Sequence, residues 1–123
     1  MGDARILIVD DDMDIRATLA DLLQDEGYTV SAVANGREAL AYLREHLFTS
    51  VVLLDLMMPV MDGFQFRAEQ KNDPQLASIP IVAMTAGWPI EPGTIDVQEI
   101  VPKPLNLPSL LEAIRRAEEN AST

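Results

Sequence analysis

Acidic side chains follow two short apolar runs of this sequence. Asp10 and Asp11 come directly after the run at residues 6–9, and Asp55 comes directly after the run at residues 51–54. Short apolar runs bounded by turn residues are typical of strands that are buried on both faces of a parallel sheet. In open α/β sheets, the carboxyl ends of such strands carry the ligand site. A carboxylate at that edge can act as a nucleophile, and Asp55 is our candidate.

Three carboxylates at one edge of a sheet would repel one another. Each pair about 4 Å apart costs about 4 kcal/mol at an effective dielectric constant of about 20. A hard divalent cation relieves this repulsion, and Mg²⁺ favours carboxylate and phosphate oxygens. Thr85 follows an apolar run, and Lys103 stands shortly after another. The hydroxyl offers a hydrogen-bond donor, and the ammonium offers a charge suited to a phosphoryl group.

Strand and helix patterns alternate along the whole chain. Gly27 is placed to end the first helical stretch, and Asp62 can cap the third. Asn106, with Pro108 in the turn that follows, can begin the last helix. The expected strands are 6–9, 28–34, 51–54, 81–84 and 97–101, and the expected helices start near Asp14, after Asn35-Gly36, near Phe64 and at Asn106.

Five strands with helices between them predict right-handed crossovers and a doubly wound, flavodoxin-like parallel sheet of the α/β class. We expect the strand order 2-1-3-4-5, which makes the first and third strands neighbours. Residues 87–95 contain two prolines and two glycines. These residues oppose helix formation, so we expect the fourth helix to be short or replaced by a loop. Trp88, within this segment, is expected to cover the core; if it is exposed instead, it would serve as an anchor for a partner.

The charge balance is strongly acidic, with 20 Asp and Glu residues against nine Lys and Arg and a formal net charge of −11. Affinity for nucleic acid depends on basic side chains that neutralise phosphates, so direct binding to nucleic acid is not expected. No apolar run approaches the ~20 residues that span a bilayer, and no secretory signal opens the chain, so we expect a cytoplasmic protein without membrane association. His46, the single histidine, is expected at the surface near a helix end.

These motifs together resemble the receiver domain of two-component response regulators, and the similarity covers nearly the whole chain. It rests on five segments in the same order: Ile6 to Asp11, Leu54 to Pro59, Met61-Asp62-Gly63, Met84-Thr85-Ala86 and Lys103-Pro104. The resemblance implies that Asp55 accepts a phosphoryl group from a phosphohistidine on a histidine kinase or a phosphotransfer protein. It also implies that Thr85 bonds the phosphoryl group on activation and that Lys103 pairs with it. Phosphorylation would then alter a surface that contacts an unknown downstream protein.

The same resemblance implies a Mg²⁺ site. Asp11 would bind the ion directly and Asp10 partly through water, while Asp55 and the backbone carbonyl of Met57 would complete the protein ligands. The domain would catalyse its own phosphorylation, hold the aspartyl phosphate and later hydrolyse it. We expect residues 1–123 to form a single receiver domain with no effector domain, whose output comes from protein contacts.

Two features depart from the family pattern. Ile100 stands where a receiver domain usually carries a switch aromatic residue, so coupling between an aromatic ring and Thr85 is not expected. Lys103 follows Thr85 by 18 positions, a shorter interval than usual, and prolines occupy the place of the family's fourth helix. We therefore expect the face that usually carries output and dimerisation to be remodelled.

Three alternative functions differ in what they require of the sequence. An aspartate-based, Mg²⁺-dependent phosphohydrolase would place its Asp-x-Asp motif at Asp10 and Asp12, but Asp14 stands where that family has threonine or valine. A flavodoxin-like cofactor binder would need a loop rich in glycine, serine and threonine after the first strand, and here that loop is acidic. A constitutive protein-binding adaptor with a receiver fold is excluded by no sequence feature and stays open.

Overall fold

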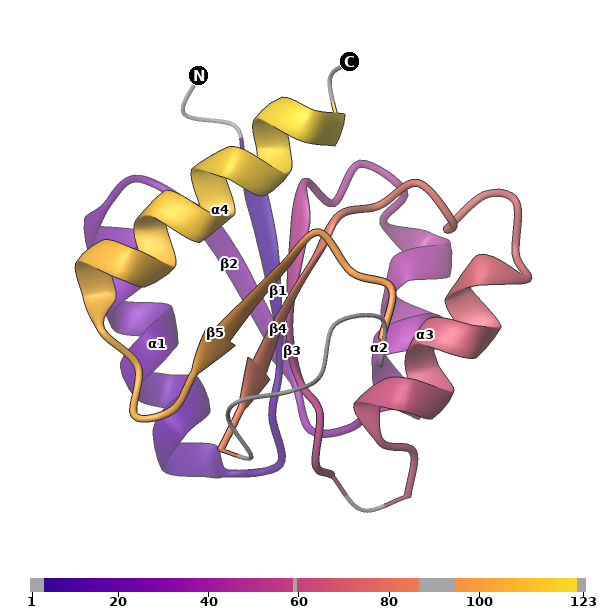
Figure 1. Ribbon diagram of the computed structural model, residues 1–123, viewed down its shortest axis with the longest axis horizontal. Coiled ribbons are helices and arrows are strands. Elements are labelled where there is room, and N and C mark those ends of the chain that lie inside the picture. Colours follow the sequence, from indigo (N-terminus) through magenta and orange to yellow (C-terminus); the bar gives the residue numbers. More distant parts are fainter. Residues whose placement is uncertain (1–3, 59, 87–94, 122–123) are drawn as a thin grey trace.

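Five strands and four helices make up the part of the chain that the structure describes, which is residues 4–58, 60–86 and 95–121 of a computed structural model (Figure 1). The strands are β1 (Arg5–Val9), β2 (Thr29–Val33), β3 (Val51–Asp55), β4 (Ile81–Thr85) and β5 (Glu99–Pro102). The helices are α1 (Met13–Asp25), α2 (Gly36–Glu45), α3 (Gly63–Lys71) and α4 (Leu107–Ala121). All strands are parallel and lie in the order β2-β1-β3-β4-β5, which confirms the predicted fold class and strand order.

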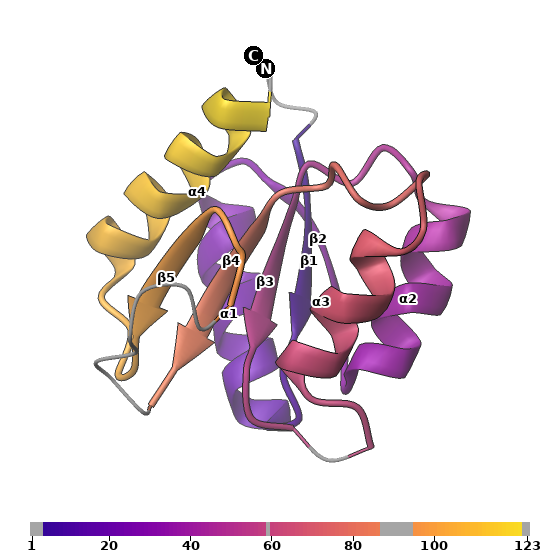
Figure 2. The same ribbon diagram turned by 45° about the vertical axis from the view of Figure 1, so that its right-hand side comes forward.

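Helices cover both faces of the sheet, with α1 and α4 on one face and α2 and α3 on the other (Figures 1 and 2). Successive side chains of a strand point to opposite faces. β3 therefore supplies Val51 and Leu53 to one apolar cluster and Val52 and Leu54 to the other. Burial of one such aliphatic side chain stabilises the fold by about 1.5–3 kcal/mol. Because every residue of β3 and β4 is buried, these runs are continuously apolar rather than alternating.

Short polar side chains set the starts of the helices. Asp12 is the N-cap of α1, and its side chain accepts hydrogen bonds from the backbone N–H groups of Asp14 and Ile15. Asp62 caps α3, as predicted, and forms a capping box with Gln65. These bonds satisfy N–H groups that have no partner within the helix. The helices that follow β1 and β3 therefore begin at fixed positions close to the ends of those strands.

The other predicted helix boundaries agree with the structure to within a few residues. Gly27 follows α1 with a φ of 98°, a left-handed conformation that favours glycine. Asn35 is the N-cap of α2, and its side chain accepts a hydrogen bond from the N–H of Glu38. Asn106 accepts a hydrogen bond from the N–H of Ser109 at the start of α4, as the prediction of a cap requires.

The last strand begins later than the sequence predicts. A strand is expected over residues 97–101, whereas β5 starts two residues further on. Ile95 and Val97 instead pack against the core cluster under α2 and α3, so the apolar pattern there reflects burial outside a strand. Gln98 joins this segment to β4, because its N–H donates to the carbonyl of Ile81 and its side chain accepts from the Ile81 N–H.

The connection between β4 and β5 contains no helix in its described residues, Ala86 and 95–98. The prediction for residues 87–95 falls on a segment of which only Ile95 is described, and the expected position of Trp88 also lies outside the described residues. The helix labelled α4 is thus the one predicted to follow Asn106. Within the described ranges, each helix is too short or too polar to cross a bilayer.

Candidate functional site

The carboxyl ends of β1 and β3 meet at one edge of the sheet, the lower edge in Figure 1. Val9 lies opposite Leu54 in the register of these strands, so the next residues, Asp10 and Asp55, lie side by side at the ends of adjacent strands. Carboxylate oxygens of Asp10, Asp11 and Asp55 lie within 4.8 Å of one another. Asp10 is fully buried and Asp55 is 5% exposed, whereas Asp11 is exposed to solvent. The three acids singled out from the sequence therefore form one cluster.

Lys103 brings a positive charge to the two buried acids. It lies just beyond β5, and its Nζ is 3.2 Å from Asp10 Oδ2 and 3.4 Å from Asp55 Oδ2. Its backbone N–H donates to the carbonyl oxygen of Thr85 at 2.8 Å, which holds the base of the lysine side chain at the end of β4. One ammonium faces three carboxylates, so the cluster keeps an excess of negative charge.

The surroundings of the two facing charges shift both pKa values. Burial raises the pKa of Asp55, and the carboxylate of Asp10 raises it further, while the Met57 N–H and Lys103 oppose the shift without cancelling it. Burial lowers the pKa of Lys103, but the charges of Asp55 and Asp10 outweigh this effect, so its pKa is raised. The lysine is therefore held as an ammonium ion beside a carboxylate whose environment disfavours its charge.

The loop after β3 fixes Asp55 through the backbone. The Leu56 N–H donates to the carbonyl of Met84, and the Gly63 N–H donates to the carbonyl of Leu56, both at 3.1 Å. A Cβ on Gly63 would lie 2.8 Å from the Leu56 Cα, so this close approach requires glycine. The Met57 side chain is 69% exposed, while its N–H donates to Asp55 Oδ1 at 3.1 Å. The role of the Met57 carbonyl as a metal ligand stays a prediction.

Thr85 ends β4 at the same edge of the sheet. It is buried, with 3% of its surface exposed, and its neighbour Met84 lies opposite Asp55 in the register of β3 and β4. Its carbonyl is tied to Lys103 by the backbone bond described above. Thr85 thus lies on the strand next to Asp55, and a hydrogen bond from its hydroxyl to a phosphoryl group stays a prediction.

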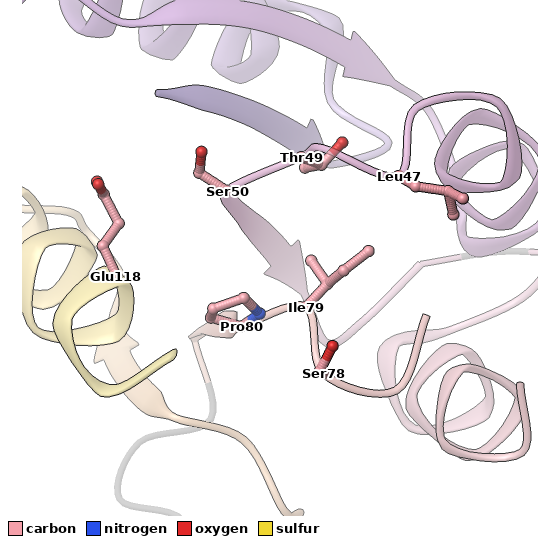
Figure 3. Close-up of a pocket in the computed structure, with 7 residues that line it drawn as sticks. All are labelled: Leu47, Thr49, Ser50, Ser78, Ile79, Pro80 and Glu118. Atoms are coloured by element: carbon pink, nitrogen blue, oxygen red, sulfur yellow. The ribbon is translucent and has the colours of Figure 1, made fainter. Parts of the chain in front are cut away.

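A separate depression of about 350 Å³ lies at the amino ends of β3 and β4, at the opposite end of these strands from the acidic cluster (Figure 3). It is lined by Leu47, Thr49, Ser50, Ser78, Ile79, Pro80 and Glu118. His46 lies next to this lining, at the end of α2, where its ring stacks on Tyr42 with centroids 3.9 Å apart. None of these residues belongs to the acidic cluster. His46 lies near a helix end, as predicted, and outside the acidic cluster.

The donor atoms of the acidic cluster suit a hard divalent cation. Carboxylate oxygens are the ligands that Mg²⁺ and Ca²⁺ prefer, whereas softer metals favour thiolate and imidazole groups. Within the described part of the chain, the carboxylate of Asp11 accepts no hydrogen bond, so its oxygens are available as ligands. A divalent cation would also balance the charge that Lys103 leaves uncompensated.

Arg16 received no role from the sequence, yet it contacts the cluster. Its Nη1 donates to the backbone carbonyl of Asp10 at 2.7 Å. Arg16 lies in the first turn of α1, and side chains of a helix lean towards its N-terminus, which here means back over the loop that carries Asp10 and Asp11. This lean directs attention to the side chains in the first turn of α1, but it does not by itself single out Arg16 in the sequence.

Curated proteins and a family model place these features in a known context. The model of the response regulator receiver domain matches residues 6–115. Response regulator Rre1 of Synechocystis sp. is 36% identical over 126 residues, which cover 96% of this chain and 54% of that protein. The response regulator receiver protein Anae109_2439 of Anaeromyxobacter sp. is 36% identical over 110 residues, which cover 88% of this chain and 46% of that protein. The chain thus spans about half the length of these two relatives.

Solved structures agree with this match. The chemotaxis protein CheY4 of Vibrio cholerae superposes with a TM-score of 0.84 at 33% identity, covering 94% of this chain and 98% of that chain. The signal receiver domain of a histidine kinase from Syntrophus aciditrophicus gives a TM-score of 0.83 at 27% identity, covering 95% of this chain and 91% of that chain. The family match over most of the chain, the sheet order and the acidic cluster agree, and the chain therefore belongs to the response regulator receiver domains of two-component systems.

Proposed function

We propose that Asp55 is the phosphoacceptor of this receiver domain and takes its phosphoryl group from a phosphohistidine. The observation that carries the proposal is the shared lysine, whose Nζ lies 3.4 Å from Asp55 Oδ2 and 3.2 Å from Asp10 Oδ2. Asp11 stands beside this pair with its carboxylate open to solvent. A nucleophile, a cation and the ligands for a second cation are thus gathered around the place where one phosphoryl group would bind.

In the proposed transfer, a carboxylate oxygen of Asp55 forms a bond to phosphorus while the bond from phosphorus to the imidazole nitrogen of the donor breaks. The imidazole nitrogen leaves with the electron pair of the broken bond. The Met57 N–H donates to Asp55 Oδ1 and so orients the carboxylate. Lys103, which contacts Asp55 Oδ2, can pair with the phosphoryl oxygens once the carboxylate has become an acyl phosphate.

Receiver domains bind a divalent metal at their acidic pocket, and we propose Mg²⁺ for this chain. The protein ligands would be those predicted from the sequence: Asp10, Asp11, Asp55 and the Met57 carbonyl. When bound, the ion neutralises negative charge on the transferring group. Asp10 Oδ1 already accepts from the Asp12 N–H at 2.9 Å, and Asp10 Oδ2 faces Lys103. This favours Asp11 as the direct ligand and Asp10 as one that acts partly through water.

Receiver domains interact with histidine kinases and with downstream effectors. For this chain we propose a histidine kinase or phosphotransfer protein as the donor and a protein, rather than nucleic acid, as the target, since the net charge is −11. Ile100 packs against the core cluster and has no aromatic ring that could follow a movement of the Thr85 hydroxyl. The signal would then pass through the Thr85 hydroxyl and the Lys103 ammonium to the ends of β4 and β5, which the backbone bond between these two residues joins.

The test is phosphorylation by a small donor. The wild-type protein is incubated with Mg²⁺ and acetyl phosphate, and intact mass is measured for a base-labile adduct. We expect one phosphoryl group on the wild type and on the control Asp21→Asn, which removes an exposed carboxylate from α1. Asp55→Asn should carry none. An adduct of undiminished yield on Asp55→Asn would refute the assignment.

The same experiment separates the alternatives. A constitutive adaptor would give no phosphoryl adduct even when acetyl phosphate and Mg²⁺ are both present. Its partner would bind equally with and without acetyl phosphate. A phosphohydrolase would release phosphate from the donor over many turnovers, faster than the adduct on Asp55 forms and decays. Thr85→Ala should still accept phosphate but lose the change in partner binding, and unchanged output would contradict its role.

A further inference from the structure

Each polar group of Asp10 has a hydrogen-bonding partner. Its N–H donates to the carbonyl of Val33 at 3.2 Å, and its Oδ1 accepts from the Asp12 N–H at 2.9 Å. Its Oδ2 faces Lys103 at 3.2 Å, and its carbonyl oxygen accepts from Arg16 Nη1 at 2.7 Å. The bond from Arg16 is the shortest of the four. It acts on the backbone and not on the carboxylate.

That carbonyl belongs to the peptide unit that joins Asp10 to Asp11. Because a peptide unit is planar, fixing its oxygen also fixes the N–H and the Cα of Asp11. The Asp12 N–H, which donates to Asp10 Oδ1, holds the following peptide unit, so the two bonds together set the direction in which the Asp11 side chain leaves the backbone. The Asp11 carboxylate is exposed, and among the described residues no donor holds it. Its placement therefore depends on the backbone that Arg16 holds.

We propose that Arg16 is a positioning residue for the divalent-cation site: it holds the Asp10–Asp11 peptide so that the carboxylate of Asp11 is directed to the ion before the ion binds. This inference rests on the proposed function only in taking Asp11 as a cation ligand. Groups that orient metal ligands commonly contribute 10- to 100-fold in metal affinity. Arg16 would be such a group and would touch neither the ion nor the phosphoryl group.

A purely electrostatic role for Arg16 has the opposite sign. Among the described residues Arg16 forms no ion pair, and its side chain is half-buried, with the guanidinium directed to a neutral carbonyl. Loss of a positive charge near a cation site would by itself strengthen cation binding. Loss of the hydrogen bond that orients Asp11 would weaken it. The direction of the change in Mg²⁺ affinity therefore distinguishes positioning from charge.

The test is isothermal titration of the unphosphorylated protein with MgCl₂. We expect Arg16→Met to raise the Kd for Mg²⁺ about 10-fold, and Arg16→Lys, which can still donate from this position, to recover most of the affinity. Arg37→Met is the matched control, because it removes the same charge from an exposed site on α2. Its Kd should stay within about twofold of the wild type, as expected for a screened surface charge.

A Kd for Arg16→Met that is equal to or lower than the wild-type value would overturn the proposal. Urea unfolding of each variant checks that the titrated protein is folded, and Arg16→Gln replaces Arg16→Met if that variant does not fold, with the same expected loss. Titration needs no phosphoryl transfer. A wild type that binds Mg²⁺ but never forms the Asp55 adduct would therefore refute the proposed function and leave the role of Arg16 to be decided by the Kd values.

A second measurement distinguishes positioning from a general structural defect. The rate of phosphorylation by acetyl phosphate is followed as the Mg²⁺ concentration is raised. If Arg16 only positions Asp11, Arg16→Met should need about 10-fold more Mg²⁺ for half-maximal rate but reach nearly the wild-type rate at saturation. A reduced maximal rate with an unchanged half-maximal Mg²⁺ concentration would contradict the inference.

Discussion

Two networks of buried charge lie on this domain, and their charges are balanced differently. The first surrounds Arg67 of α3, which is 7% exposed. Its Nε donates to the carbonyl of Asp96 at 2.5 Å, and its Nη1 donates to Gln70 Oε1 at 2.7 Å. The Gln70 amide nitrogen in turn donates to the carbonyls of Leu76 and Ile79, each at 2.9 Å. The buried donors of Arg67 and Gln70 thus find acceptors within the domain, and we call this network closed.

The second network is the acidic cluster, which does not close in this way. Lys103 contacts Asp10 and Asp55, but a third carboxylate, that of Asp11, lies within 4.8 Å of them and is exposed. The cluster therefore carries more negative charge than its protein partners neutralise. Its position at the carboxyl edge of a parallel sheet is also the position at which ligands bind in such folds.

The pKa shifts alone would not separate the two networks. Burial is the largest cause for both residues: it lowers the pKa of Arg67 and raises the pKa of Asp55. What differs is the supply of partners. A network in which each donor finds an acceptor within the domain stabilises the fold, whereas a network with surplus charge and an exposed oxygen is suited to bind a ligand. Three predictions test this distinction, from the largest expected effect to the smallest.

Removal of the Lys103 ammonium from the acidic cluster should have the largest effect. Lys103→Met leaves Asp10 and Asp55 buried without an ammonium, and we expect the free energy of unfolding to fall by about 3 kcal/mol at neutral pH. Asp55 already has a raised pKa, so its folded form binds a proton more tightly than its unfolded form. The penalty is absent below the ordinary pKa of 3.8 and develops as the pH rises through the raised folded pKa.

Urea unfolding in EDTA at several pH values checks this prediction. The deficit of Lys103→Met should shrink as the pH is lowered, and it should also shrink at neutral pH when Mg²⁺ replaces EDTA, because the ion supplies the missing charge. Arg37→Met, at an exposed site on α2, is the control for a lost charge. A deficit that depends on neither pH nor Mg²⁺ would mean that Lys103 acts by packing alone.

Opening the closed network should have a smaller effect of a different kind. Arg67→Met removes the donor to Gln70 Oε1 and leaves that buried oxygen unpaired, which should lower the free energy of unfolding by about 2 kcal/mol. This loss should not respond to Mg²⁺, and the folded variant should still accept phosphate at Asp55. Urea unfolding with and without Mg²⁺ measures it. A deficit relative to the wild type that shrinks on adding Mg²⁺ would show that the two networks are coupled.

Removal of the exposed ion pair between Lys71 and Asp96, beside the closed network, should have the smallest effect on stability. Lys71 Nζ lies 2.9 Å from Asp96 Oδ2, but the two side chains are 49% and 73% exposed. Lys71 is the main cause of the lowered pKa of Asp96, yet solvent screens the pair, so Lys71→Met should cost only a small fraction of the loss seen for Arg67→Met. Raising the salt concentration should abolish the difference from the wild type in urea unfolding. A salt-independent loss would point to packing of the lysine stem.

The sequence predicts most of the fold because its signals are local. The apolar run of β3, the cap at Asp62 and the terminating Gly27 each depend on a few neighbouring residues, and the structure has all three. The start of β5 is predicted wrongly. Val97 is apolar because it packs against the core cluster, and this burial does not require it to pair in a strand. Arg67 shows the same limit: its partner Asp96 lies 29 positions away, and no local pattern marks an arginine as buried.

For the site, the sequence by itself determined which chemical groups stand at the ends of strands: the acids after β1 and β3, Thr85 at the end of β4 and Lys103 after β5. Only the tertiary structure decided how they meet. Lys103 reaches Asp10 across 93 positions of sequence, and Arg16 holds a backbone carbonyl that has no signature in side-chain type. These contacts depend on sheet register and side-chain direction, which arise only when the strands pair and the helices pack against them.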